Sequence, residues 1–204
     1  MFHLLFYSGL INIKPRKQLL VILSAILAIA GLIFLFLAFK IEIKAKVAQY
    51  LLNNAWDKTI ETGDEYEPWP GFDGYPILKL SIPKFNLQQI VLSNTSGQSL
   101  AFGPSFHPET YLPKENKITA ISSHRDSHGY YIRDLKINDF VILEDKEDNK
   151  FTYKVKNFKI INVEDKDLQF NKKNSQLLLI TCYPFDAVIS GTNLRYIVFS
   201  ERIY

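Results

Sequence analysis

A continuous apolar stretch of 22 residues without one charge, from Gln18 to Phe39, restricts the organisation of the chain more than any other feature. As an α-helix rising about 1.5 Å per residue it would extend roughly 33 Å, enough to cross a hydrocarbon core of about 30 Å. Signal peptides have shorter apolar regions, about 7–15 residues, that end in a small-x-small cleavage site. Residues 28–30, Ala-Ile-Ala, have that pattern but lie inside the run. We therefore expect residues 18–39 to be an uncleaved transmembrane anchor.

Basic residues flank this stretch on both sides. Lys14, Arg16 and Lys17 precede it, and further lysines follow from Lys40 onward. Positive charge favours the cytoplasmic side, and we expect residues 1–17 to form a short cytoplasmic N-terminus. The rest of the chain then lies outside the cytoplasm, on the periplasmic or cell-surface side of a single-pass membrane protein.

Residues 40–75 are predicted to be an amphipathic helix followed by a linker. Apolar side chains recur at helical spacing up to about Glu61, and the segment Glu67–Gly71, with two prolines and a glycine, ends the pattern. The folded domain is expected to begin after this break and to comprise residues 76–204. The apolar positions of the predicted helix are Ile43, Val47, Tyr50, Leu51 and Ala55.

The charge balance excludes a nucleic-acid-binding domain of the usual kind. Four of the 24 lysines and arginines lie in residues 1–40, which contain no acidic residue. The remaining chain has 20 basic and 21 acidic residues, a net charge of −1. Such a domain has no basic field that would attract nucleic acid.

After Pro76 the sequence consists of short apolar segments bounded by Pro, Gly, Asn or Asp. About eight such segments with closely spaced turn signals predict an all-β fold, either a sandwich or a barrel. The charged run 144–150 joins two of them and is expected to be a solvated hairpin tip rather than a calcium site. The predicted strands are 77–82, 89–92, 117–122, 140–143, 151–155, 158–163, 177–182 and 196–199.

The only cysteine, Cys182, stands at the end of an unbroken apolar run that is typical of a fully buried strand. Thirteen residues later Arg195 opens a second apolar run, and pairing of the two strands would bring thiol and guanidinium together. Such a pair suggests a nucleophile and a group that stabilises an oxyanion. A free cysteine can also be a small buried hydrophobe. An unpaired thiol on an extracytoplasmic domain is unusual, which favours a chemical role.

Of the four histidines, only His124 lies where the strand pattern would direct it to the thiol. It ends the predicted strand 118–123 and precedes a polar turn, 125–129. Together with the lone cysteine and the arginine it is a candidate general acid and base. His107 lies in the loop 103–108, where we expect an ordinary loop residue. One cysteine and scattered histidines do not supply the three or four ligands of a zinc site, and no metal is expected.

Together these residues resemble the sortase family of membrane-anchored cysteine transpeptidases. The resemblance rests on an apolar run that ends in Thr181-Cys182, on Arg195, and on His124 at the end of an earlier strand. Residues 124–128, His-Arg-Asp-Ser-His, are similar to the His-Arg-Asp-Thr-His segment of class D and Gram-negative-type sortases. Ser123 departs from the pattern, because a glycine commonly precedes the histidine.

The resemblance implies a closed β-barrel of about eight strands with short helices over residues 76–204. It implies that Cys182 attacks the Thr-Gly bond of a Leu-Pro-x-Thr-Gly-like sorting signal and forms a thioester. His124 would protonate the leaving amine and activate the incoming one, Arg195 would hold the oxyanion, and Thr181 would contribute to substrate binding. No cofactor is implied. The partners would be a secreted or membrane-tethered protein with this C-terminal signal and an amine acceptor in the cell envelope.

Two other classes of function are consistent with the same sequence features. A membrane-anchored cysteine hydrolase or peptidase would use the same groups with water as the acceptor. A non-enzymatic extracytoplasmic binding module would leave Cys182 in the core and Arg195 on the surface. Asp126 and His128 stay outside the predicted catalytic set, because an aspartate in a turn can equally cap backbone amides.

Overall fold

The computed structural model describes residues 15–164, 175–187 and 191–204. The chain divides into two compact units, Met1–Lys46 and Val47–Tyr204. Most of the predicted cytoplasmic segment lies outside the described residues. The first unit contains the predicted anchor, and the second contains all the strands.

Helix α1 (Pro15–Thr62) includes the whole charge-free stretch. Within α1, Arg16–Leu37 has a mean hydropathy of 3.0 and meets the length and composition of a membrane span. Large apolar side chains of this segment are exposed, Phe34 by 73% for example. A helix of this kind satisfies its own backbone hydrogen bonds and offers lipid an apolar surface. The predicted anchor is therefore a continuous helix of sufficient length.

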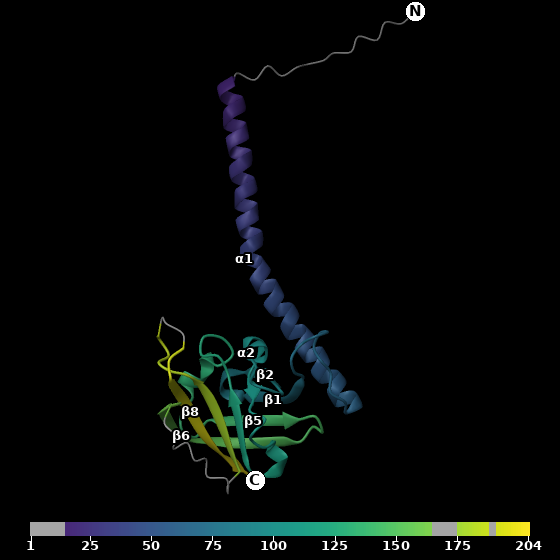
Figure 1. The fold of residues 1–204 in the computed structure, drawn as a ribbon, viewed down its shortest axis with the longest axis vertical. Helices are drawn as coiled ribbons and strands as arrows, with labels where there is room; N and C mark the ends of the chain where they lie inside the picture. Colours follow the sequence, from purple (N-terminus) through teal and green to yellow (C-terminus); the bar gives the residue numbers. More distant parts are fainter. Residues whose placement is uncertain (1–14, 165–174, 188–190) are drawn as a thin grey trace, which may run out of the picture. The chain divides into compact units, whose positions relative to one another are not determined.

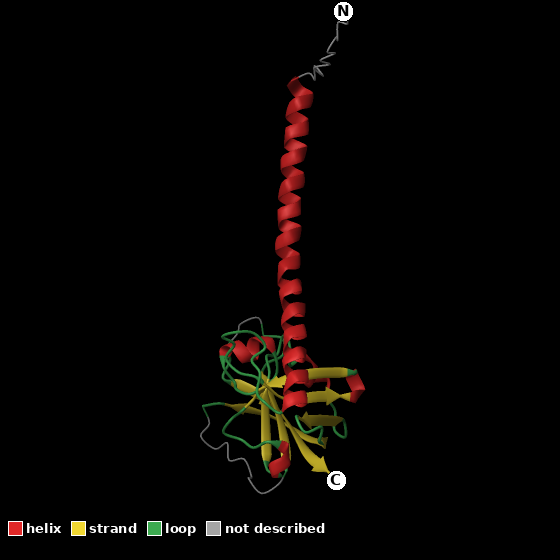
Figure 2. Ribbon diagram, turned by 90° about the vertical axis from the view of Figure 1, so that its right-hand side faces the viewer, coloured by secondary structure: helices red, strands yellow, loops and turns green. Residues whose placement is uncertain are grey.

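Eight strands form a closed barrel in the second unit (Figure 1), and Figure 2 shows the short helical segments between them. The strands are β1 (Pro76–Ile82), β2 (Leu87–Leu92), β3 (Ser105–Phe106), β4 (Ile118–Ser122), β5 (Phe140–Asp145), β6 (Lys150–Asn162), β7 (Gln176–Cys182) and β8 (Leu194–Ile203), with helix α2 (Gly97–Phe102) and 3-10 turns at Pro83–Phe85, Pro113–Glu115 and Tyr130–Asp134. Around the barrel the order is β1-β2-β3-β4-β7-β8-β6-β5. Neighbours are antiparallel except for the parallel pairs β2–β3 and β4–β7. The predicted all-β fold is confirmed as a closed barrel.

The predicted and observed numbers of strands are equal, but two individual assignments differ. The predicted strands 151–155 and 158–163 belong to the single strand β6, whose pairing with β8 shifts register between Val155 and Asn157. Strand β3 was not predicted, because a strand of two residues has no measurable periodicity. The net count therefore stays at eight.

Alternate residues of the strands fill the barrel. Leu78, Leu80 and Ile82 of β1 are fully buried, while the residues between them are partly exposed. This period of two follows from the pleat, which directs successive side chains to opposite faces. The interior is completed by Val91, Val141, Leu143, Tyr153, Val155, Leu177, Leu179 and Val198, among others.

Strand β7 is buried on both faces. Leu177 and Leu179 point into the barrel, whereas Leu178 lies on the outer face and is nevertheless fully buried. On that outer face it packs with Ala120 of β4 and Ile197 of β8. Two covered faces remove the need for polar residues, which explains the unbroken apolar run before Cys182.

The second unit begins earlier in the chain than the predicted domain boundary. Leu52, near the end of α1, is completely buried and packs against Phe72. Trp69, from the Pro- and Gly-containing break, lies edge-to-face on Phe72 with the ring centroids 4.5 Å apart. These apolar contacts attach the predicted linker region to the barrel, and the compact unit therefore starts at Val47.

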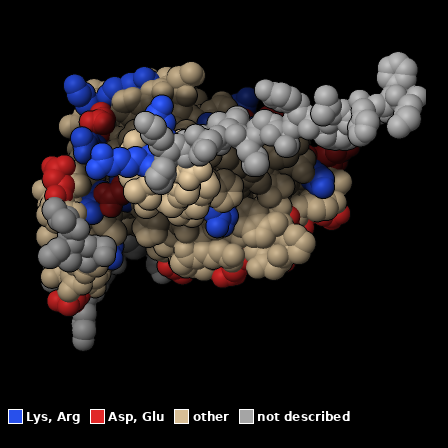
Figure 3. Space-filling view, turned by 90° about the horizontal axis from the view of Figure 1, so that it is seen from above, with Lys and Arg blue, Asp and Glu red and all other residues tan. Residues whose placement is uncertain are grey.

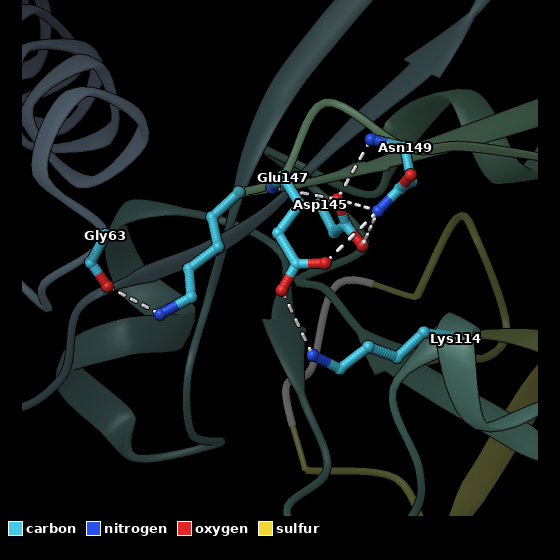
Figure 4. A network of polar contacts seen from close by, with 6 residues as sticks. Gly63, Lys114, Asp145, Glu147 and Asn149 are labelled. Atoms are coloured by element: carbon cyan, nitrogen blue, oxygen red, sulfur yellow. Dashed lines mark hydrogen bonds and ion pairs between the residues drawn. The ribbon is translucent and has the colours of Figure 1, made fainter.

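The charged hairpin between β5 and β6 is held together by one carboxylate (Figure 4). Asp145 is only 8% exposed and accepts the backbone N–H groups of Glu147 at 2.9 Å and Asn149 at 3.0 Å. At the exposed tip, the Lys114 amine lies 3.5 Å from the Glu147 carboxylate. The Asp145 carboxylate therefore stabilises the backbone of the turn. It is buried, whereas the prediction had the whole run 144–150 as a solvated tip.

Charged side chains of both signs are spread over the face shown in Figure 3. On the barrel, ion pairs join neighbouring strands, such as Lys79 with Glu144 at 3.5 Å and Lys156 with Glu201 at 3.6 Å. This mixture agrees with the near-neutral charge balance of residues 41–204.

Candidate active site

The parallel pair β4–β7 brings His124 and Cys182 to the same end of the barrel wall. Ser122 is the register partner of Ile180, and the Ser123 N–H donates to the Ile180 carbonyl at 3.0 Å. His124 and Cys182 each lie two residues beyond this register pair. Because paired parallel strands advance by the same rise per residue, the two residues occupy neighbouring positions at the strand ends.

The antiparallel pair β7–β8 places Arg195 on the other side of the cysteine. Cys182 and Arg195 are direct register partners, and the predicted pairing of the two strands is thus observed. Nη1 of Arg195 donates to the carbonyls of Thr192 at 2.6 Å and Leu194 at 2.9 Å. Within the described parts of the chain, its Nε and Nη2 groups have no hydrogen-bond acceptor. These donors are available to a bound molecule.

A groove of about 290 Å³ runs along the outer face of the barrel and reaches Arg195. The groove lies on the face opposite the barrel core, where β4, β7 and β8 present small or apolar side chains. Cys182 is on this face, because it is separated from Ile180 by one residue on the same strand. The residues that line the groove are His107, Glu109, Thr110, Ala120, Ser122, Ile161, Val163, Ile180, Arg195 and Ile197.

Thr181 has its side chain on the inner side of the strand. It is 2% exposed, and its hydroxyl donates to the Ser123 carbonyl at 2.8 Å. The hydroxyl therefore joins β7 to the end of β4 and is not directed into the groove. The sequence predicted that Thr181 contributes to substrate binding. Its buried side chain points away from the groove and does not reach a substrate there directly.

The turn after His124 depends on a close approach between Ser123 and Gly129. The Gly129 N–H donates to the His124 carbonyl at 2.8 Å, which closes the turn. A Cβ atom at Gly129 would lie 2.5 Å from the Ser123 hydroxyl oxygen and 2.9 Å from the His124 carbonyl oxygen. The serine that departs from the family pattern is thus accommodated by a glycine on the opposite side of the turn.

His107 is part of the groove wall, although the sequence suggested an ordinary loop residue. Its Nε2 lies 2.7 Å from the Ser122 hydroxyl, and its Nδ1 lies 2.9 Å from a Glu109 carboxylate oxygen. The backbone N–H of Glu109, together with His107, lowers the pKa of the Glu109 carboxyl group. His107 directly follows the strand β3, which places it at the groove. The sequence did not reveal this, because a strand of two residues is too short to be recognised.

Arg125, the residue after His124, connects the histidine turn to the segment that follows Cys182. Its Nη1 donates to the Pro184 carbonyl at 2.5 Å, and its Nη2 donates to the Ala187 carbonyl at 2.8 Å. Its Nε donates to Asp126 at 2.8 Å, and the side chain is only 9% exposed. The sequence carried no signal for these contacts, because the acceptors are backbone carbonyl groups.

The two other polar residues of the turn have distinct environments. Asp126 is largely exposed, and its hydrogen bond with Arg125 lowers the pKa of its carboxyl group. His128 is half-buried, and this burial lowers the pKa of its imidazole. Neither residue is placed next to Cys182 by the strand register. No cluster of three or more potential metal ligands occurs among the residues that the structure describes.

The fold and the site define a closed β-barrel protein in which one cysteine is flanked by a histidine and an arginine on its two neighbouring strands. The sequence profile of the sortase domain matches residues 80–203, which include all these positions. The chain belongs to the sortase family.

Known proteins similar to this chain include members of class D. Sortase D of Bacillus subtilis (strain 168) is 29% identical over 125 residues, which cover 61% of this chain and 62% of that protein, less than two thirds of its length. A solved sortase D5 transpeptidase of Clostridium perfringens has a TM-score of 0.62 at 17% identity, covering 78% of this chain and 99% of the other. Sortase C of the same organism, solved with the C-terminal cell wall sorting motif, has a TM-score of 0.55 at 22% identity, covering 79% and 90%.

Proposed function

We propose that this chain is a membrane-anchored cysteine transpeptidase that transfers a protein carrying a C-terminal sorting signal to an amine. The observation that supports this most is the placement of His124 and Arg195 on the two strands beside Cys182, with Arg195 lining a groove on the same face. The strand register that sets this placement involves three separate segments of the chain. A cysteine that merely packed in the core would not need it.

In the first half of the proposed reaction, the Cys182 sulfur forms a bond to the carbonyl carbon of the Thr-Gly peptide bond. The negative charge that develops on the carbonyl oxygen is stabilised by the Nε and Nη2 donors of Arg195, which have no acceptor among the described residues. The carbon–nitrogen bond then breaks, and His124 gives its proton to the leaving amine. The product is a thioester between Cys182 and the threonine carbonyl.

In the second half an acceptor amine replaces the leaving peptide. Neutral His124 takes a proton from the amine as its nitrogen attacks the thioester carbonyl. The carbon–sulfur bond breaks and the Cys182 thiolate is released, which restores the starting state. Thr181 contributes indirectly, because the hydrogen bond from its buried hydroxyl to the Ser123 carbonyl holds the ends of β4 and β7 together.

A sorting-signal peptide is the substrate that suits the groove. An extended peptide can lie along a strand-lined surface and use pockets for alternate side chains. The apolar floor formed by Ala120, Ile180 and Ile197 matches the apolar residues of a Leu-Pro-x-Thr-Gly-like signal. The likeness to the sortase C that was solved with a cell wall sorting motif adds support for this substrate class.

The helix Arg16–Leu37 supports a location at the cytoplasmic membrane, with the barrel on the extracytoplasmic side. A substrate protein held in the same membrane would meet the enzyme at a high effective concentration, without any additional contact. The amine acceptor would belong to the cell envelope on that side.

The test incubates the full-length protein in detergent with a Leu-Pro-x-Thr-Gly peptide, with and without an added amine, and follows both by mass spectrometry. We expect an acyl adduct on Cys182 and a product that carries the amine, and neither with Cys182→Ala. Cleavage by water alone, even with amine present, would favour the hydrolase. A wild-type protein that forms neither adduct nor product with a reactive thiol would contradict the proposed substrate class.

A further inference from the structure

Arg125 has a different arrangement from Arg195, although both guanidinium groups lie near the nucleophile. All three nitrogens of Arg125 donate to protein acceptors, namely the Pro184 and Ala187 carbonyls and the Asp126 carboxylate. A guanidinium has five N–H donors, and these contacts use four of them. Arg125 therefore has little capacity left to bind a substrate, but it is well suited to hold two segments of the chain together.

The segment that Arg125 holds comes directly after the nucleophile. Pro184 is two residues and Ala187 five residues beyond Cys182. The barrel fixes only the start of this segment, through the Tyr183 N–H that donates to the Leu194 carbonyl at 3.1 Å. Beyond that point, a backbone bond from the Ala187 N–H to the Pro184 carbonyl is long, 3.4 Å. The carbonyl groups that receive Arg125 therefore lie where the main chain has left the sheet.

Aromatic rings support the same segment from the strand β8. Tyr183 stacks on Tyr196 with the centroids 6.2 Å apart, and Phe185 meets Tyr196 edge-to-face at 4.9 Å. These ring contacts are apolar and have no strict direction, whereas hydrogen bonds from a planar guanidinium to two carbonyls fix both distance and orientation. The Thr192 hydroxyl and the Leu194 carbonyl hold Tyr183 at the start of the segment, and Arg125 supplies directional contacts to the part beyond it.

We propose that Arg125 is a positioning residue that keeps the histidine turn and the segment after Cys182 at a fixed separation. Arg125 follows His124 directly in the chain, and its carbonyl acceptors, Pro184 and Ala187, follow Cys182. We call these two hydrogen bonds the Arg125 bridge; it connects the segment after His124 to the segment after Cys182. Asp126 orients the guanidinium by its own bonds at 2.8 and 3.0 Å. This inference rests on the proposed function for its effect on catalysis, whereas the bridge itself can be measured without turnover.

The effect expected on catalysis is a loss of turnover with little change in substrate binding. Displacing reacting groups by about 1 Å can cost about 100-fold in rate. Among the described residues, the hydrogen-bond acceptors of Arg125 are not residues that line the groove. For Arg125→Gln in the full-length protein we expect kcat for acyl transfer to fall about 10- to 100-fold. The KM for the peptide should stay within about twofold. Arg125→Lys, which can reach only one carbonyl at a time, should have an intermediate kcat.

Arg133 is the matched control. It is an arginine of the 3-10 turn Tyr130–Asp134 whose Nη1 lies 3.8 Å from Asp186 in the same segment, and its side chain is 53% exposed. Arg133→Gln removes a positive charge beside the segment but removes no hydrogen bond to its backbone. We expect wild-type kcat and KM. Equal losses in Arg133→Gln and Arg125→Gln would overturn the proposal, since loss of charge alone would then explain the effect.

Hydrogen exchange provides the readout that does not depend on turnover. We expect Arg125→Gln to raise the exchange rates of amides in residues 183–187, with strands β4 and β7 and the circular dichroism spectrum unchanged. Unchanged exchange in this segment, or an unchanged kcat in Arg125→Gln, would overturn the positioning role. If the wild-type protein failed to process any peptide while the exchange difference was present, the proposed function would fail and the bridge would stand.

Discussion

Cys182 and Arg195 are direct register partners in the antiparallel pair β7–β8, although thirteen residues separate them in the chain. The pairing places the thiol and the guanidinium on the same outer face, because partners in a sheet point to the same side. His124 approaches from the opposite neighbour, β4. The proposed nucleophile therefore has one of its two proposed catalytic partners on each adjacent strand.

Removal of Arg195 should reduce turnover strongly without unfolding the protein. Loss of one oxyanion donor typically costs about 100- to 1000-fold in kcat, and we expect this for Arg195→Ala in the peptide assay. Cys182→Ala should abolish acyl transfer, and His124→Ala should nearly do so. Circular dichroism should show intact barrels in all three. Full activity of Arg195→Ala would remove this residue from the oxyanion role.

Substitution of His107 should affect peptide binding more than the chemical step. His107 lines the groove and its Nε2 lies 2.7 Å from the hydroxyl of Ser122, the last residue of β4, whereas its own main chain pairs with Ala120, four residues before His124. One hydrogen bond contributes about 1 kcal/mol, roughly a fivefold change. We expect His107→Ala to raise KM by about this factor with kcat within twofold, measured by steady-state kinetics. A large fall in kcat with constant KM would instead place His107 in the catalytic step.

A methyl group at Gly129 should destabilise the histidine turn. The Cβ of Gly129→Ala would approach the Ser123 hydroxyl and the His124 carbonyl closely, and overpacking of this kind costs about 1–3 kcal/mol. Urea unfolding should report a loss in that range. The double variant Ser123→Gly with Gly129→Ala should recover part of it.

Gly97→Ala is the control for the turn glycine. A Cβ there would meet nothing within 4 Å, and we expect a change in unfolding free energy below about 1 kcal/mol in either direction. If both glycine variants had the same stability, close approach between Ser123 and Gly129 would not constrain the turn.

Burial of His128 should make the protein less stable in mild acid. Because burial lowers the pKa of this imidazole below its ordinary value of 6.5, the unfolded chain takes up a proton that the folded protein resists. The stability contribution is complete above about pH 6.5 and decreases as the pH falls below it. His128→Gln has no such proton, and its melting temperature should fall less between pH 7.5 and 5.5 than that of the wild type. Parallel melting curves for the two proteins would contradict the expectation.

The strands and the central pair of the site could be predicted because both leave a mark in the sequence. An apolar run covered on both faces, as in β7, lacks polar residues, and a lone cysteine at its end is easily noticed. His124 was found in the same way, because it directly follows a predicted strand, and the resemblance to the family then supported it. The start of the second unit at Val47 was missed, because helical spacing continues across it without a break.

The remaining parts of the site depend on contacts that side-chain identities do not encode. Arg125 donates to the backbone carbonyls of Pro184 and Ala187, and every residue type has such an acceptor. His107 reaches the groove through β3, a strand too short to have a pattern. The inward direction of Thr181 follows from its place between Ile180 and Cys182, but the sequence does not say which face of β7 is the outer one.

The position of Arg195 on β8 also determines when the site becomes complete during synthesis. Strand β8 pairs with both β6 and β7, so it closes the barrel and delivers the arginine in the same event. A nascent chain that has emerged only as far as Cys182 possesses the thiol and His124, but neither the closed barrel wall nor Arg195. For the proposed reaction, an incomplete chain therefore lacks Arg195 and the closed barrel at the same time, because both arrive with the same strand.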